Sequence, residues 1–377
     1  MALEHGIDLV IELPVIAATS SAETFAQGGV CLLDSLGVVS HISFGAEANT
    51  TSDIDMLDKL ADFFAFEPPA FQKYLDLELK SGYSFPAARA KAAVLCLQQM
   101  AFDSMNTDTV AQLVQLLASP NNILAIEYMK AIRRQNLTLT PSVVTRNGAG
   151  YHDTDTDTEL ASASALRKFI FQDNSCQKTD SEVLNQMLTR TVPDSVRELL
   201  LNAYKTHAFL QEDDFSDLLY YELRRKFLHS AFSDSDTECS DLEKRIANNL
   251  ETFTCWSDFV SDLKTKNQTY TAISRHLLHA FLGIDAELLA AAKNCHYAPY
   301  ARILGFRKDA SPLLKELQEH SQIPLLRKIA KERQSLTPEQ QQLLDLDVYA
   351  SDLYNRILFS KTGIQRKNEY RQPLIIL

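Results

Sequence analysis

The sequence predicts an α/β fold with a doubly wound parallel sheet, followed by an all-α domain. The chain has 377 residues, more than one hydrophobic core usually organises, so we expect two domains. In the first half, apolar strand-like segments alternate with helical patterns, which is typical of a parallel sheet covered by helices. Beyond residue 180 the patterns are almost entirely helical. We therefore expect one domain over residues 1–175 and a helical one over residues 176–377.

Three segments of the first domain predict strands: residues 8–14, 38–44 and 137–144. The first, DLVIELP, has an apolar core ended by a proline, as a buried parallel strand would. The spacing of apolar residues between and after the strands predicts helices. These expected helices cover residues 21–36, 53–64, 68–80, 85–99, 107–118 and 123–134, with a further one beginning near Ser162.

The second domain is expected to contain helices, with a strand at most near the C-terminus. The boundary is placed at residues 172–180, where the sequence QDNS breaks the helical pattern. The expected helices cover residues 181–189, 194–206, 213–232, 240–251, 256–265, 270–282, 284–293 and 312–319.

The beginning of the chain predicts that the sheet is N-terminally incomplete. Residues 1–6 resemble the last turns of a helix that ends at Gly6, without a preceding cap or helix body. Three strands are also few for a doubly wound sheet. Both observations lead us to expect that the first strands of this domain lie before Met1.

The composition excludes several classes of protein. With 45% hydrophobic and 23% charged residues, the chain is typical of globular proteins rather than disordered or fibrous ones. No apolar run reaches the roughly 18 residues that a membrane helix needs, so no membrane span is expected. The six cysteines form no CxxC pair and the sequence shows no signal peptide. We therefore expect reduced cysteines and a cytoplasmic location.

The net charge of −12 is unevenly distributed. Residues 1–170 carry 20 acidic and 11 basic side chains, whereas residues 171–377 carry 29 and 26. Within residues 302–333, eight basic side chains outnumber four acidic ones. A basic face on an acidic protein can still bind phosphates, because the local electrostatic potential governs phosphate binding more than the net charge does. A solvated helix surface is the alternative interpretation.

Standard catalytic signatures are absent from the sequence, which has no GxGxxG, GxxxxGK[ST], HExxH or GxSxG. The stretch DTDTDT at residues 153–158 superficially resembles a calcium loop. An EF-hand needs glycine at loop position six and glutamate at position twelve, where this chain has Thr158 and Ser164. We interpret the stretch as an acidic surface loop and expect no metal site in the protein.

Small and polar residues follow the predicted strands, where α/β proteins bind ligands. Gly45 follows the second strand, and glycine there lets a nucleotide approach the backbone; a simple turn glycine is the alternative. Asn121 stands at a helix start, where an asparagine is otherwise only a cap. Arg146 follows the third strand in a glycine-containing loop, a plausible position for a phosphate ligand.

A further candidate anion site is formed by Ser162, Ser164 and Arg167. The segment ASASALRK places hydroxyl side chains at a helix N-terminus and a guanidinium one turn later. Backbone N–H groups, hydroxyls and Arg167 would together attract an anion. Each of these signals is unspecific alone, but their recurrence at consecutive strand ends predicts a nucleotide-binding site.

In this order, the segments DLVIELP, FGAE, PNNILAIEYMKAI, TRNGAGYHD and ASASALRK resemble the tRNA(Met) cytidine acetate ligases. The segments DLLYYELRR, LEKRI and YARILGF resemble the same family, so the resemblance covers essentially the whole chain. The family belongs to the HxGH nucleotidyltransferase superfamily. The resemblance implies a nucleotidyltransferase-like ATP-binding domain and an enzyme that activates acetate with ATP as acetyl-adenylate. It then implies acetylation of the exocyclic amine of the wobble cytidine in elongator tRNA(Met).

The resemblance also implies roles for particular residues. Gly45, Asn121 and Arg146 match the ATP-contacting positions of the family, and Ser162, Ser164 and Arg167 match a second phosphate motif similar to ISSTxIR. ATP, together with Mg²⁺, is the implied substrate. Acetate and elongator tRNA(Met) are the other implied partners, without a membrane or an obligate protein partner.

The helical domain is expected to help hold the tRNA. Basic side chains on its helices are candidate phosphate contacts, although solvated helix charge is the alternative interpretation for each. These candidates are Arg224, Arg225, Lys226, Lys264, Lys266 and Arg275.

The sequence departs from the family at one motif. The family segment EYNPFHNGH, whose histidines stabilise charge on the transferring phosphate, has no counterpart here, and none of the nine histidines lies in an HxGH arrangement. No catalytic residue is therefore assigned. A catalytically inactive tRNA-binding protein of the same family is the alternative function. An adenylyltransferase acting on a small metabolite is a third, although it has no need for the helical half.

Overall fold

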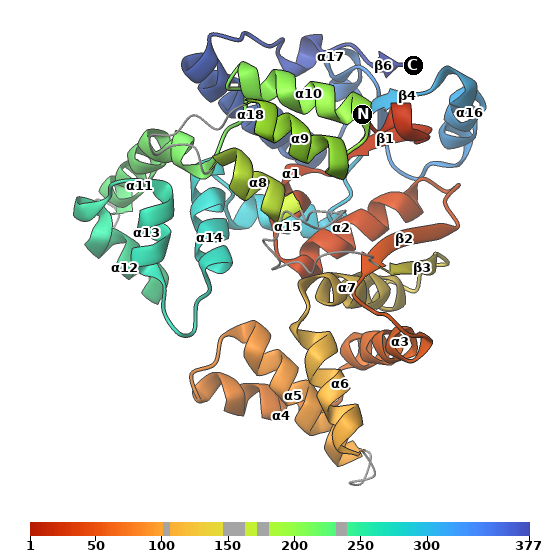
Figure 1. Ribbon diagram of the computed structural model, residues 1–377, viewed down its shortest axis with the longest axis vertical. Helices are drawn as coiled ribbons and strands as arrows, with labels where there is room; N and C mark the ends of the chain where they lie inside the picture. The colour runs from red at the N-terminus through yellow and green to blue at the C-terminus, as the bar shows by residue number, and fades with distance from the viewer. Residues whose placement is uncertain (101–105, 146–162, 172–180, 231–239) are drawn as a thin grey trace.

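The computed structural model describes residues 1–100, 106–145, 163–171, 181–230 and 240–377. This part of the chain is mostly helical, with two small sheets (Figure 1). In order, the elements up to residue 171 are β1 (Leu9–Glu12), α1 (Val15–Ala18), α2 (Ala22–Ser35), β2 (His41–Ala46), α3 (Thr51–Phe66), α4 (Pro69–Lys80), α5 (Phe85–Met100), α6 (Thr107–Ala118), α7 (Pro120–Arg134), β3 (Thr140–Thr145) and α8 (Ala163–Phe171).

The remaining elements are again mainly helices, but strands occur among them. They are α9 (Ser181–Thr191), α10 (Asp194–Lys205), α11 (Ser216–Ser230), α12 (Asp241–Asn249), α13 (Trp256–Leu263), α14 (Tyr270–Leu282), α15 (Ala286–Asn294), β4 (Ala301–Phe306), α16 (Ser311–His320), β5 (Leu325–Leu326), α17 (Ile329–Glu332), α18 (Pro338–Thr362) and β6 (Ile375–Ile376). The sequence-based expectation of an all-α second half is therefore wrong.

The strands of the first half do not share one sheet, which corrects the expectation of a doubly wound sheet holding all three. Strands β2 and β3 form a parallel pair, with Gly45 opposite Val144. Strand β1 instead pairs antiparallel with β4, and β5 and β6 add to β4 in parallel. The physical reason is that an apolar run shows that a strand is buried but carries no information about its partner.

The sheet around β4 joins the two ends of the sequence. Leu9 pairs with Phe306, and Ile375 pairs with Gly305, so both chain termini lie at the same end of the molecule (Figure 1). Four of the six residues of β4 are buried. The prediction of a domain boundary near residue 175 stays a prediction, and this strand pairing crosses it.

The longest helix of the described chain, α18, was not predicted from the sequence, although its ends carry the usual capping residues. Thr337 and Gln340 form a capping box, Pro338 occupies the first turn, and Gly363 ends the helix in the left-handed conformation with φ 73°. Its apolar residues are interrupted by polar ones on the buried face, among them Asp347, which obscures the periodicity. In contrast, Gly6 was expected to end a helix and does end a 3-10 helix at Leu3–His5 with φ 92°.

Among the described residues, four hydrophobic cores hold the helices together. One lies among α3 to α7 and β2, with Phe63, Phe64 and Phe71 in edge-to-face contact. A larger core joins α11 to α15 with α17 and α18, and includes Ile16 of α1. Two smaller ones lie between α2 and β4, and between α2, α7 and β2. Helix α2 thus packs between the parallel strand pair and the C-terminal sheet. Within the described residues, no helix is long and apolar enough to cross a membrane.

A buried carboxyl group fixes α1 against α18. Asp347 is 3% exposed, accepts a hydrogen bond from the backbone N–H of Val15 at 2.7 Å, and accepts another from the Tyr300 hydroxyl at 2.6 Å. Burial raises the pKa of Asp347 to about 7, because the two hydrogen bonds only partly offset the loss of water. Nearby, the buried Arg302 guanidinium pairs with Glu12 and Glu369.

The raised pKa predicts that Asp347 makes the protein less stable as the pH rises toward 8. The folded-state pKa of about 7 lies above the unfolded value, so this group's contribution is fully present at low pH and is lost as the pH rises through 7. Asp347→Asn keeps an acceptor for Val15 but cannot ionise. Between pH 5 and pH 8, the free energy of unfolding of the parent should fall by about 2 kcal/mol relative to that of the variant. Urea denaturation at both pH values tests this. An equal change in the free energy of unfolding between pH 5 and pH 8 for the two proteins would contradict it.

Candidate functional site

The parallel strands β2 and β3 end side by side and form the first wall of the candidate site. Their register places Ala46 opposite Thr145, so the carboxyl ends of both strands open at one edge. Gly45 is exposed at this edge. The Thr145 hydroxyl donates to the Ala48 carbonyl across the edge at 3.0 Å, which holds the segment after β2 against the end of β3. In parallel α/β sheets this edge is where ligands bind.

The N-terminus of α7 is fixed to the same edge by two asparagines. Asn121 Nδ2 donates to Glu47 Oε1 at 2.6 Å, immediately beyond β2. Asn122, only 1% exposed, accepts from the Glu47 backbone N–H at 2.8 Å and donates to the Glu47 carbonyl at 3.4 Å. Ser119 caps the helix. The structure therefore brings Gly45 and Asn121 to one edge, with Glu47 between them.

The other predicted nucleotide contacts lie on or before α8. Arg146 and Ser162 lie outside the described residues. Ser164 is half-buried and Arg167 exposed on α8. Their part in a nucleotide site stays a prediction.

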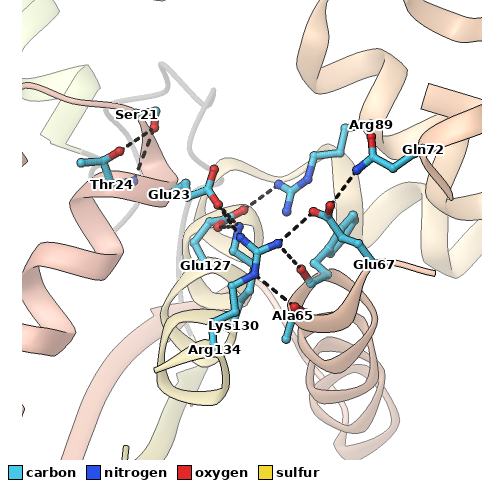
Figure 2. Close-up of polar contacts among 11 residues, drawn as sticks. Ser21, Glu23, Thr24, Ala65, Glu67, Gln72, Arg89, Glu127, Lys130 and Arg134 are labelled. Carbon is cyan, nitrogen blue, oxygen red and sulfur yellow. Dashed lines mark hydrogen bonds and ion pairs between the residues drawn. The ribbon is translucent and has the colours of Figure 1, made fainter. Parts of the chain in front are cut away.

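A chain of ion pairs runs along α7 on a face that Figure 2 shows in close-up. Arg89 of α5 pairs with Glu127 at 2.6 Å, and Glu127 pairs with Lys130 at 2.5 Å. Lys130 pairs in turn with Glu23 of α2 at 2.7 Å. Glu127 and Lys130 are 2% and 3% exposed, so two opposite charges are buried within one helix turn.

Arg134 extends this chain to α3. Its guanidinium contacts Glu23 at 3.0 Å and Glu67 at 3.2 Å, and donates to the carbonyls of Phe64 and Ala65 at the end of α3 (Figure 2). Burial raises the pKa of Glu23, but the hydrogen bond and charge of Lys130 and the charge of Arg134 outweigh it and lower the pKa overall. Glu23 is therefore a carboxylate at neutral pH. The network ties α2, α3, α5 and α7 together.

A cavity of about 330 Å³ opens beside this network. Its walls come from the start of α2, from α5 and α7, and from residues 267–275 at the start of α14. Volumes of this size are typical of small-ligand sites. Its walls contain the carboxylates of Glu23, Glu67 and Glu127, the cations of Arg89, Lys130 and Arg275, and the rings of Phe64 and Phe85.

The predicted tRNA contacts fall into two groups. Three successive side chains of α11 already have partners: Arg224 donates to the Tyr220 hydroxyl at 3.0 Å, Arg225 to Glu222 at 2.7 Å and Lys226 to Glu243 at 3.0 Å. Lys264 and Lys266 are exposed between α13 and α14. Arg275 is half-buried on α14, where burial lowers its pKa. The second group therefore offers charge that is not already neutralised by a carboxylate of the described chain.

One group of side chains could hold a metal ion among the residues that the structure describes. Glu316, Glu319 and His320 lie together, exposed, on α16. Exposed acidic groups of this kind are common without a metal, and in Figure 1 α16 is remote from the α3–α7 lobe that carries the cavity. This cluster therefore does not belong to the candidate site.

Sequence reasoning identified Asn121 but missed Asn122, Glu47 and the ion pairs. The spacing of Glu127 and Lys130 at i and i+3 was a readable signal for an ion pair within a helix. The burial of this pair was not readable, because its partners are distant in the chain. Glu23 lies 107 residues from Lys130, and Arg89 lies 38 residues from Glu127.

Comparison with known proteins places these features in a family. A family model described as HIGH Nucleotidyl Transferase matches residues 1–370. The chain is 35% identical over 372 residues to a tRNA(Met) cytidine acetate ligase of Clostridium perfringens, covering 98% of this chain and 84% of that protein. It is 34% identical to the protein of the same name from Thermoanaerobacter sp., covering 100% of this chain and 86% of that protein.

Two solved structures from Thermotoga maritima resemble the fold over the whole chain. Apo TmcAL gives a TM-score of 0.82 and TmcAL bound with alpha-thio ATP gives 0.79, each at 26% identity and each covering 100% of this chain and 86% of that one.

The buried ion pairs predict that removing one charge destabilises the fold strongly. Lys130→Met leaves the buried Glu127 with Arg89 as its remaining cation, and loss of one partner from a buried pair typically costs about 3–5 kcal/mol. Lys73→Met, on an exposed position of α4, is the matched control and should cost less than about 0.5 kcal/mol. Urea unfolding of both variants gives the comparison. Similar losses in the two variants would mean that the network does not stabilise the fold.

Proposed function

The chain belongs to the tRNA(Met) cytidine acetate ligase family of HIGH nucleotidyltransferases, and we propose that it uses ATP to acetylate the wobble cytidine of elongator tRNA(Met) with acetate. The observation that carries the proposal is the edge at which β2, β3 and the start of α7 meet. Gly45 is exposed there, and Asn121 is held there through Glu47. An exposed glycine beside a helix N-terminus suits a nucleotide, because glycine has no side chain to obstruct the approach and the helix end favours its phosphates.

The proposed reaction has two steps. The carboxylate of acetate attacks the α-phosphorus of ATP, which forms acetyl-adenylate and releases pyrophosphate. The exocyclic amine of the cytidine then attacks the acetyl carbonyl, loses a proton and displaces AMP. The solved relative that is bound with alpha-thio ATP supports a nucleotide site in this fold.

The remaining predicted contacts complete the proposal. Arg146 is proposed to contact the phosphates from the end of β3, and Ser162, Ser164 and Arg167 are proposed as a second phosphate site. Mg²⁺ is proposed to accompany ATP and would neutralise charge on its phosphates. A Mg²⁺ ion bound with ATP needs only one or two protein carboxylates, because phosphate oxygens and waters supply its other ligands.

The helical half is proposed to bind the tRNA. Among the predicted contacts, Lys264, Lys266 and Arg275 are the stronger candidates, because Arg225 and Lys226 are paired with carboxylates. Residues 1–175 would then bind ATP, and residues 176–377 would hold the RNA.

A catalytically inactive tRNA-binding protein of the same family is the alternative function. Acetate-dependent exchange of labelled pyrophosphate into ATP separates the two functions. Exchange that needs acetate, followed by acetate-dependent labelling of tRNA(Met), supports the ligase. Salt-dependent tRNA binding without any exchange supports the alternative.

The nucleotide site predicts a strong effect of a side chain at Gly45. Gly45→Val should raise the Kd for ATP at least about tenfold, which corresponds to about 1.4 kcal/mol, because the added methyl groups occupy the exposed edge. Valine is a good strand residue, so the fold should persist. His41→Val is the matched control, since His41 is exposed on the same face of β2 at its other end. Calorimetric titration with ATP measures both, and equal affinities for the two variants would exclude Gly45 from the site.

A further inference from the structure

The charged side chains that line the cavity beside the ion-pair network indicate which kind of ligand it can bind. Its lining holds three carboxylates and three cations, so it offers no excess of either charge. A phosphate group would meet carboxylates there as well as cations. A neutral ligand that both donates and accepts hydrogen bonds fits this lining better.

The carboxylate of Glu23 provides an acceptor at the cavity. Its Oε1 accepts from Lys130 at 2.7 Å and from Arg134 at 3.0 Å (Figure 2). Its Oε2 has no hydrogen bond to any residue that the structure describes, and the side chain is 51% exposed. The two bonds at Oε1 fix the orientation of the carboxylate. Oε2 is therefore a positioned acceptor for a donor on a ligand.

The guanidinium of Arg275, on α14, provides donors at the same cavity. It is half-buried on α14 and has no hydrogen bond or ion pair within the described part of the chain. A partly desolvated guanidinium without a protein partner gains from a ligand acceptor such as a carbonyl or ring nitrogen. The cavity thus presents an acceptor from α2 and donors from α14.

An aromatic ring supplies the third element. Phe64 is buried and its face is covered by the Arg89 guanidinium at 3.9 Å. Phe85 also lines the cavity but is 55% exposed, so its ring is open to contact. Unpaired bases are recognised by stacking on such rings together with hydrogen bonds to their edges.

These features describe a flat heterocycle with an exocyclic amine beside ring acceptors. Cytosine presents an amine donor next to N3 and O2 acceptors, which complements Glu23 Oε2 and Arg275. The cavity is also next to the nucleotide site along α7. Ile123 lines it two residues after Asn121, on the same first turn of the helix.

We infer that this cavity between α2, α5, α7 and α14 receives the acceptor cytosine, with Glu23 binding its amine, Arg275 its N3 acceptor beside O2, and Phe85 its face. Uracil carries a donor at N3 in place of this acceptor. The inference rests on the proposed function for the identity of the base. It assigns the three residues to substrate binding and not to ATP binding.

The test uses the full chain and two short RNA stem-loops that differ only in the wobble base, cytidine or uridine. Uridine has a carbonyl in place of the amine, which would face the Glu23 carboxylate. The parent should bind the cytidine loop at least about tenfold more tightly than the uridine loop in fluorescence anisotropy. Glu23→Gln should reduce this preference to less than about threefold. Arg275→Ala should weaken binding of the cytidine loop at least about fivefold, with little effect on the uridine loop.

Controls distinguish this inference from simple electrostatics and from the ligase proposal. Lys293→Ala removes an exposed charge on α15, away from the cavity lining, and should leave the cytidine preference intact. Pyrophosphate exchange needs no RNA and should be the same in Lys293→Ala as in the parent. If exchange fails in the parent while the cytidine preference is present, the ligase proposal fails and the cavity inference stands.

Three outcomes would overturn the inference. One is equal affinity of the parent for the two loops. A second is an equal loss of affinity for the two loops in Glu23→Gln or Arg275→Ala, which would mean that these residues make only general electrostatic contacts. A third is loss of ATP affinity in Arg275→Ala together with displacement of the cytidine loop by ATP, which would make the cavity an adenine pocket. Thermal unfolding of Glu23→Gln shows whether the loss of its charge destabilises the fold. Arg275→Ala tests the cavity without changing any residue of the ion-pair network.

Discussion

Helix α7 carries the buried charges on which the arrangement of the candidate site depends. Desolvating Glu127 and Lys130 is unfavourable unless each is paired with good geometry. They pair with each other within α7, and the packing of α2 and α5 against α7 adds the partners Glu23 and Arg89. The charges therefore allow one relative position of these helices and penalise others. Because the same helix begins at Asn121, the nucleotide edge is held by the same constraint.

A second constraint closes the molecule at the opposite end of α2. Strand β1 is only four residues long and half-buried, and its pairing with β4 links residues about 290 positions apart. Asp347 and Arg302 fasten the segment that follows β1 to the C-terminal elements. Helix α2 lies between the two sheets. It packs against β4 in one core and against α7 and β2 in another, and so links the C-terminal sheet to the helix that carries the ion-pair network.

The sequence predicts what is local and fails where the outcome depends on distant partners. Helices α6 and α14 have the expected bounds, because caps such as Asn106 and Thr269 and a regular apolar stripe define them. The partner of β1, the strand character of residues 301–306 and the burial of Lys130 depend on tertiary packing. At the site, Gly45 and Asn121 follow from their positions after a strand and at a helix start. Asn122 carries the backbone hydrogen bonds and looks in the sequence like any residue of the first turn.

The proximity of the two proposed subsites along one helix has a mechanistic consequence. Asn121 and Glu127 are six residues apart, about 9 Å along a rigid helix, so the spacing of nucleotide edge and cavity is set by α7 and not by a loop. Transfer of an acetyl group to an amine requires the two reactants to approach in a fixed orientation, and holding them so replaces a bimolecular encounter. A helix anchored by buried ion pairs at one face and by asparagines at its start provides such a fixed frame. The stability of the network and the positioning of the substrates are therefore properties of the same contacts.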